Sequence, residues 1–526
     1  MSAKKASDSI LIDGHSLSIQ QIVSAARDHQ PAAISDNART EITRSAEAVA
    51  SIVESDEPVY GINTGFGIFS NRRIDSEQRQ SLSHNLVQSH AVGLGEPFPI
   101  DVTRAAMLIR ANSLAHGYSG IRLQLIECLI QMLNKDVVPL IPSQGSLGSS
   151  GDLAALAHLA LVLSKAIPPN HETIPLVHYQ NKMLPADKAM QQARIDRHDL
   201  GPKEGLALIN GATFSAALLS LACHDSQILL NTALGAAALS LEALLAVPAA
   251  FDARLHEARP HPGQIKIAAA IRGLTEGSQL LGSSERVQDA YSLRCIPQVL
   301  GPVLETLDFV ARTTEVEVNA ATDNPLIFDQ IALSGGNFHG QPIGLASDYL
   351  KIALSEVGAI AERRIFRLLD PTANLGLPAM LVPDKDLEGL HSGLMMLQYT
   401  AASLVLENLS LASPDSIHSL PTSAGQEDHN ANATTGARRL AQVVNNVRNI
   451  LAIELLVASQ AVELRLISQP NLRLGNGTER IYQAVRHQVP LIDHDQTMTT
   501  FVETLNQMIA RGEFSALVEP LLAGTS

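Results

Sequence analysis

Long stretches of apolar residues at helical spacing constrain the fold of this chain more than any other feature. In the segments 339–370 and 427–467, apolar residues recur every three or four positions, which predicts two long helices. Around residues 450–462 the run is apolar on more than one face, as in a helix at the centre of a bundle. Strand signals are few and short, as at 10–12 and 324–333. The sequence therefore predicts a mainly α protein built around a long central helical bundle.

The composition agrees with tightly packed helices. The chain has 526 residues, 45% of them hydrophobic, but only 3% are aromatic and Trp is absent. The core must then consist mainly of Leu, Ala, Ile and Val. The most apolar run, 229–251, contains Asn231 and Glu242 and is expected to end at Pro248, whereas a membrane span needs a cleaner run of ~20 apolar residues. We interpret this run as a buried helix and expect no membrane partner.

Charge and cysteine usage indicate the compartment and exclude some partners. The net charge of −15 argues against a nucleic-acid or anionic-membrane partner. Cys128, Cys223 and Cys295 are scattered without the spacing of metal ligands, which is typical of a reduced protein without a disulfide framework. The first residues, MSAKKASDSILIDG, carry a small basic patch with no long apolar region behind it, unlike a signal peptide. We expect a cytoplasmic protein with no metal.

A loop rich in glycine and serine precedes one apolar helix, in the stretch QGSLGSSGDLAALAHLALVL, 144–163. A phosphate-binding loop would need a Gly-Lys-Ser/Thr ending, which is missing. A tight turn capped by Ser150 or Asp152 explains the helix start but not three glycines. The third interpretation is chemical. In a strained Ser-Gly turn, the unshielded glycine amide can attack the carbonyl before the serine, and dehydration then gives a ring with an exocyclic methylene, an electrophile that no ordinary side chain provides.

The segment GSLGSSGDLAALAH resembles the loop of the aromatic amino acid ammonia-lyase family. The prosthetic group of that family is 4-methylidene-imidazol-5-one (MIO). The resemblance implies that MIO forms autocatalytically from Ser149, Ser150 and Gly151. The family usually has Ala at the first of these positions, but that residue contributes only backbone atoms to the ring, so a serine should be tolerated.

Six further blocks resemble the family and appear in the family's order across nearly the whole chain. They are YGINTGFG (60–67), HNLVQSHAVGLGEP (84–97), KEGLALINGATFSAAL (203–218), RVQDAYSLRCIPQVLGP (286–302), SGGNFHGQP (334–342) and SLPTSAGQEDH (419–429). Each block alone is a weak signal, whereas their joint occurrence is specific. The Met-Pro-Lys loop of the distantly related fumarase-like lyases is absent. The resemblance implies a fumarase/histidase-like fold, with a loop-rich MIO-bearing catalytic domain over 1–225 and a helical region over 226–526.

The resemblance also implies roles for individual residues. Tyr60 would be the base that removes the β-proton, which requires a stabilised phenolate because a free phenol has a pKa of about 10. Arg294 would bind the substrate carboxylate with its planar fork. Asn210 would orient that carboxylate or stabilise charge on MIO. Tyr291 would assist proton transfer near MIO. The residues expected to orient the substrate and line the pocket are Gln288 and Phe338.

Three positions bear on the substrate. His90 lies in a Ser-His-Ala pattern similar to that of histidine-acting members, although some tyrosine aminomutases share it. Glu427 stands where histidine-acting members carry Glu and phenylalanine-acting members carry Gln, and a carboxylate can accept a hydrogen bond from an imidazole N–H. Met395 matches a pocket methionine of histidine-acting members, or is plain helix core.

The resemblance implies elimination of ammonia from L-histidine to give trans-urocanate. The alternative is an MIO-dependent lyase or 2,3-aminomutase acting on tyrosine, phenylalanine or histidine. Ala290 and Ile296 depart from the pattern of histidine-acting members. A non-catalytic helical paralogue would not be expected to retain the site residues together. The family's state is a dihedral homotetramer with active sites shared between chains, and the expected partner is a small amino acid.

Overall fold

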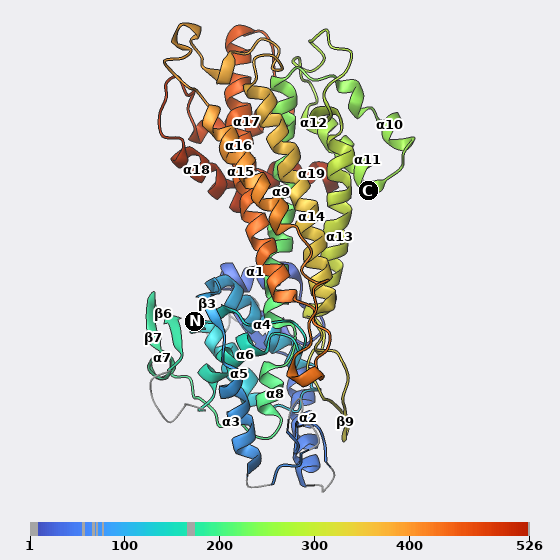
Figure 1. Cartoon of the computed structure of the whole chain (residues 1–526), viewed down its shortest axis with the longest axis vertical. Coiled ribbons are helices and arrows are strands. Elements are labelled where there is room, and N and C mark those ends of the chain that lie inside the picture. Colours follow the sequence, from blue (N-terminus) through green and yellow to red (C-terminus); the bar gives the residue numbers. More distant parts are fainter. Residues whose placement is uncertain are drawn as a thin grey trace. The chain divides into compact units, whose positions relative to one another are not determined.

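The computed structural model describes residues 9–54, 58–65, 69, 72–75, 78–165 and 174–523. It is mainly helical with a few short strands, as predicted (Figure 1). The chain forms two compact units. The first comprises Met1–His224, Val310–Asp348 and Pro414–Arg438, and the second comprises Asp225–Phe309, Tyr349–Ser413 and Arg439–Ser526. The division into domains 1–225 and 226–526 stays a prediction.

The first unit contains most of the short elements. Its helices and strands are β1 (Ile10–Ile12), α1 (Ile19–Arg27), β2 (Ala32–Ile34), α2 (Asp36–Glu54), α3 (Arg79–His90), β3 (Leu94–Pro97), α4 (Ile100–Ala115), α5 (Leu123–Asn134), β4 (Val138–Pro139), β5 (Pro142–Gln144), α6 (Leu153–Leu163), β6 (Leu176–Tyr179), β7 (Lys182–Pro185), α7 (Ala186–Ala193), α8 (Glu204–Ile209), β8 (Leu326–Phe328), β9 (Ile331–Leu333) and the 3-10 turn η6 (Ser423–Gly425). The predicted strands at 10–12 and 324–333 are confirmed as β1 and the β8–β9 hairpin.

The strands of this unit form only small sheets. β1 and β2 are parallel, β3 pairs with β5 and β8 with β9 in antiparallel fashion, and β4, β6 and β7 form a three-stranded antiparallel sheet. The core is instead helical. Every residue of α4 from Val102 to Ala115 is buried, and α6 buries nearly all of its apolar residues. A helix enclosed on all sides cannot shift easily, so α6 fixes the end of the glycine-serine loop that leads into it.

Four long helices, α9 (Thr213–Ala243), α13 (Ile296–Val318), α14 (Gln341–Leu369) and α16 (Ala433–Ser468), contribute residues to both units (Figure 1). The other elements of the second unit are η3 (Pro248–Phe251), α10 (Ala253–Glu257), α11 (Pro262–Leu274), α12 (Tyr291–Arg294), η4 (Ala379–Leu381), η5 (Lys385–Leu387), α15 (Met395–Leu411), α17 (Asn476–Gln488), α18 (Thr499–Ala510) and α19 (Ser515–Ala523). No helix of the described part is both long and apolar enough to cross a membrane.

Small residues allow the helices of the second unit to pack closely, as the Ala- and Leu-rich composition predicts. A methyl group added to Gly358 of α14 would lie 3.0 Å from Ile450 Cδ1 of α16. The apolar run 229–251 is helical and buried as predicted over residues 229–243, but α9 ends at Ala243, before Pro248, which is exposed.

A buried ion pair joins three of these helices. Arg364 of α14 donates from Nε to Glu454 Oε1 of α16 at 2.5 Å and from Nη2 to Oε2 at 2.9 Å. Ser240 of α9 adds a bond to Glu454 Oε1 at 2.8 Å. Both charged side chains are 0% exposed, so each depends on the other for its charge compensation.

We expect Glu454→Gln to destabilise the protein by about 3 kcal/mol, because the substitution leaves the Arg364 charge buried without a counter-charge. The measurement is the rate of thermal inactivation together with urea unfolding. The matched control is Glu513→Gln, since the Arg511–Glu513 pair is 60% and 42% exposed and exposed pairs contribute about 0–1 kcal/mol. Equal stability of the two variants would contradict this assignment.

Candidate active site

A cavity of about 1370 Å³ lies in the first unit. Seven of the predicted site residues line it: Tyr60, His90, Ser149, Ser150, Asn210, Phe338 and Glu427. Apolar side chains from α3, α6 and α8 complete much of its wall, including Leu86, Leu153 and Ile209. A largely apolar cavity with a few convergent polar groups is the usual form of a small-molecule site.

The glycine-serine loop is in a strained conformation at Gly151. This residue has a φ of +75°, and a methyl group on it would lie 2.0 Å from the carbonyl carbon of Gly211. Only glycine fits such a position. Two backbone bonds hold the contact, from Gly211 N to Ser150 O at 3.3 Å and from Asp152 N to Gly211 O at 2.9 Å. The loop is therefore pressed against the backbone at 210–211.

Asp152 clamps this loop instead of capping α6. It occupies the N-cap position but makes no side-chain bond to the helix, so the capping interpretation is wrong for Asp152. Its Oδ1 accepts bonds from Ser146 Oγ and Thr434 Oγ1. Its Oδ2 accepts from the Ser215 amide at 2.9 Å and the Ser215 hydroxyl at 3.0 Å. One buried carboxylate thus ties the loop to the starts of α9 and α16.

Asn210 directs its amide at the backbone of Ser150. Its Nδ2 donates to the Ser150 carbonyl oxygen at 3.1 Å, the same oxygen that accepts from the Gly211 amide. Two N–H donors on one carbonyl oxygen stabilise negative charge that develops there. Asn210 Oδ1 is buried and has no hydrogen-bond partner.

Two buried basic side chains lie close to Asp323, next to this part of the site. Lys203 Nζ donates to Asp323 Oδ2 at 2.6 Å, with both side chains almost completely buried. Arg110 is also buried, and its Nη1 would lie 3.0 Å from a methyl group on Gly211. Burial lowers the pKa of Arg110 to about 10, opposed by the Asp323 charge. Sequence reasoning missed these residues, although Lys203 is the first residue of the block 203–218.

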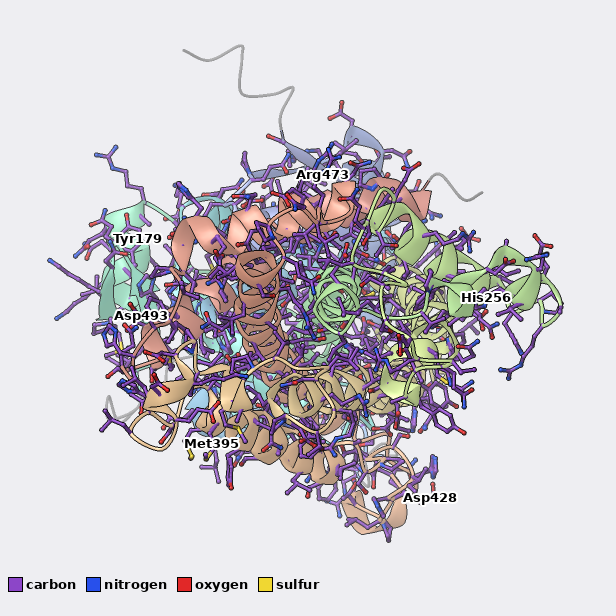
Figure 2. All side chains as sticks on the ribbon, turned by 90° about the horizontal axis from the view of Figure 1, so that it is seen from above. Tyr179, His256, Met395, Asp428, Arg473 and Asp493 are labelled. Atoms are coloured by element: carbon purple, nitrogen blue, oxygen red, sulfur yellow. The ribbon has the colours of Figure 1, made fainter. Side chains whose placement is uncertain are left out.

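Glu427 faces the two serines of the loop. Its Oε2 accepts from Ser149 Oγ at 2.8 Å and its Oε1 from Ser150 Oγ at 3.1 Å. Thr422, also missed by sequence reasoning, donates from Oγ1 to Oε2 at 3.3 Å and pairs its backbone with that of Glu427 around η6. The next residue, Asp428, is exposed (Figure 2). The tight turn therefore aims Glu427 at the loop.

His90 is held at the end of α3. Its Nδ1 lies 2.8 Å from the Leu86 carbonyl oxygen, and because a carbonyl only accepts, Nδ1 carries the proton and Nε2 is left as the acceptor. Burial lowers the pKa of His90, while the Leu86 carbonyl and the Glu427 charge oppose the shift. The side chain is therefore neutral near pH 7.

Tyr60 and Phe338 also line the cavity, and both are half-buried. Tyr60 begins a tight turn in which the Val59 carbonyl accepts from the amides of Ile62 and Asn63, both at 3.2 Å. The block YGINTGFG, 60–67, continues beyond this turn, and its last two residues, Phe66 and Gly67, lie outside the described residues.

Four predicted site residues belong to the second unit and are not among the residues that line the cavity: Gln288, Tyr291, Arg294 and Met395. Gln288 is exposed, and Tyr291 is 71% exposed with the Arg294 guanidinium 4.8 Å from its ring centre. Arg294 Nε is buried without a partner. Met395 is half-buried at the start of α15 (Figure 2). The first unit alone therefore supplies only part of the predicted site.

The helical fold and the strained Ser-Gly loop in a cavity define a class of lyase. The chain belongs to the aromatic amino acid lyase family, whose model matches residues 17–487.

Individual relatives are similar over almost their full length. The histidine ammonia-lyase of Caldanaerobacter subterraneus subsp. tengcongensis is 45% identical over 514 residues, which is 97% of this chain and 98% of that protein. The crystal structure of histidine ammonia-lyase from Trypanosoma cruzi has a TM-score of 0.88 at 37% identity, covering 97% of this chain and 95% of that one. The tyrosine aminomutase of Streptomyces globisporus has a TM-score of 0.90 at 34% identity, covering 97% and 98%.

Proposed function

We propose that the protein is a histidine ammonia-lyase that eliminates ammonia from L-histidine and releases trans-urocanate. One observation carries the choice of substrate: the Glu427 carboxylate lies in the cavity directly beside the Ser-Gly loop. An anionic acceptor suits an imidazole N–H and has no role against a phenyl ring. Relatives at about 45% identity over nearly the whole chain carry the same name.

We propose that Ser149, Ser150 and Gly151 form MIO. The fit rests on Gly151, which packs where a side chain cannot, and on the Ser150 carbonyl oxygen, which the ring would retain and which Asn210 and Gly211 already bind. Once formed, the group would supply an electrophilic carbon for the substrate amine. The protein's part is to hold the loop rigidly, through Asp152 and α6, and to place donors on the oxygen where charge develops.

The other cavity residues then have definite tasks. Tyr60 removes the β-proton, Phe338 lines the pocket, and Glu427 accepts the hydrogen bond of the substrate imidazole. Neutral His90, through its Nε2, provides a further acceptor in the cavity. The small amino acid is the partner that this site requires, and the net charge of −15 disfavours nucleic acid.

The test of this function is to incubate the pure protein with histidine, tyrosine and phenylalanine in turn. Products are identified by mass and near-ultraviolet absorbance. Conversion of histidine to urocanate at the highest rate of the three supports the proposal, whereas faster conversion of tyrosine or phenylalanine to a cinnamate-type acid contradicts it. The similarity to a tyrosine aminomutase makes a β-amino acid the outcome that would favour the mutase alternative.

We expect Glu427→Gln to lower kcat/KM for histidine by roughly 10- to 100-fold, because a hydrogen bond to a charged acceptor contributes about 1.5–3 kcal/mol. The same substitution should raise or leave unchanged the small rate with phenylalanine. Steady-state kinetics with both substrates measures the ratio. An unchanged ratio would remove Glu427 from substrate recognition.

We propose that the enzyme is a homotetramer in which Gln288, Tyr291, Arg294 and Met395 complete active sites together with other chains. One helix of the second unit has an exposed apolar stripe at helical spacing. Its members are Met396, Tyr399, Leu406 and Leu409 of α15, which are 63%, 59%, 65% and 61% exposed. Such a stripe marks an interface.

Light scattering should therefore give four times the mass of one chain. Substituting Leu406 with Glu should lower the mass and the activity together, since a buried charge disfavours the contact. A stable and fully active monomer would contradict the shared site. We also place the enzyme in the cytoplasm, because Cys128, Cys223 and Cys295 form no disulfide with one another and the first two are buried, as is typical of proteins in a reducing compartment.

A further inference from the structure

The first residue of the Ser-Ser-Gly triplet makes a contact that alanine, the family's usual residue there, cannot make. Ser149 is 8% exposed, and its hydroxyl donates to Glu427 Oε2 at 2.8 Å. With so little water access, this bond has few competitors. The second donor to the same oxygen, Thr422 Oγ1, is more distant at 3.3 Å and also lies 3.4 Å from the Glu427 carbonyl oxygen.

The two carboxylate oxygens of Glu427 differ in the hydrogen-bond donors that remain to them once the ring has formed. Oε1 accepts from the Ser150 hydroxyl, which leaves as water when Ser150 is dehydrated. Ring closure consumes only backbone atoms of Ser149, so its hydroxyl stays and continues to donate to Oε2. Oε1 thus loses its protein donor while Oε2 keeps two.

We propose that Ser149 is a positioning residue that holds the Glu427 carboxylate so that Oε1 faces the substrate imidazole. This role rests on the proposed action on histidine. A carboxylate held at one oxygen offers the other in a fixed direction, and the substrate then need not order it on binding. The specificity of this enzyme for an imidazole substrate thus depends on the residue in which it departs from its family.

The test begins with Ser149→Ala in the complete enzyme, with Ser149→Thr as the matched control that keeps the hydroxyl. Intact mass comes first, and both variants should show the loss of two waters. KM for histidine should rise roughly 5- to 20-fold in Ser149→Ala, in keeping with one lost hydrogen bond to a charged group. The change in KM should exceed the change in kcat. Ser149→Thr should restore most of the loss, and KM for phenylalanine should not move.

A binding measurement gives a readout that does not depend on turnover. In Ser150→Ala protein the second hydroxyl is absent and no ring can form. Calorimetry with L-histidine should show roughly 5- to 20-fold weaker binding when Ser149→Ala is added to this background. Adding Ser149→Thr instead should leave the affinity close to that of Ser150→Ala alone.

The outcomes separate this inference from the proposed function. If the native enzyme does not convert histidine, the function fails and the inference with it. If it converts histidine and Ser149→Ala has the KM and affinity of its parent, only the role of Ser149 is overturned. If Ser149→Ala keeps its full encoded mass and does not lose two waters, the positioning role of Ser149 is also overturned, because Ser149 would then be needed for ring formation.

Discussion

Ser150→Ala protein is expected to keep its encoded mass, apart from the substitution itself, and to lose deamination of histidine by roughly 10³-fold or more. Losses of this size or larger follow removal of a group that forms a covalent bond with the substrate. Alanine has no β-hydroxyl to leave, so the electrophilic carbon cannot form. The strained backbone should remain, since Gly151, Asn210 and Asp152 are untouched.

The intact mass of the protein tests whether MIO has formed. One water takes the Ser149 carbonyl oxygen with the amide hydrogens of Ser150 and Gly151, and a second takes the Ser150 hydroxyl with its α-hydrogen. Native protein should therefore be lighter than its encoded chain by ~36 Da, the mass of these two waters. Ser149→Ala should show the same deficit. Native protein at its full encoded mass that still releases urocanate would contradict the MIO proposal.

Tyr60→Phe should lower kcat for histidine by roughly 10²- to 10⁴-fold, the usual contribution of a positioned acid or base. The ring of Phe fills the same space at the cavity wall, so substrate binding should change little. Only the proton-accepting oxygen is lost.

Two measurements distinguish this effect from a failure to mature. The mass deficit of ~36 Da should persist in Tyr60→Phe, and its fold should be intact by circular dichroism. A histidine substrate carrying deuterium at the β-carbon should reveal whether proton removal limits the rate of each enzyme. A Tyr60→Phe enzyme with native kcat would exclude this residue as the base.

The long helices could be predicted because their core faces are periodic. The stripe over 339–370 corresponds closely to α14, Gln341–Leu369. The stripe over 427–467 predicts a helix start that is too early, since α16 begins at Ala433. The preceding residues form a polar turn in which the backbones of Thr422 and Glu427 pair. That pairing has no periodic pattern in the sequence.

The site could be predicted in its parts but not in its contacts. The Ser-Gly loop was found because its chemistry requires residues that stand next to each other. The bond from Ser149 to Glu427 spans 278 residues, and no local pattern reports such a distance. Arg110 and Asp323 could not be predicted as residues near the site for a different reason. Charged residues are mostly exposed in folded proteins, and nothing in the sequence marks these two as buried. In the proposed tetramer, the roles of Tyr291 and Arg294 depend on neighbouring chains, which no pattern within one chain can show.

The carboxylate of Asp152 joins the loop to a segment of the chain that is synthesised much later. A ribosome makes the loop at 149–151 early, but the Thr434 hydroxyl that binds Asp152 comes 282 residues later. Gly211, against which Gly151 is pressed, also follows the loop. We therefore expect the ring to close only after the chain has been synthesised past Thr434, so a nascent chain stopped before that residue should keep its full encoded mass. The loss of ~36 Da from the encoded mass would then report that folding of the first unit is complete.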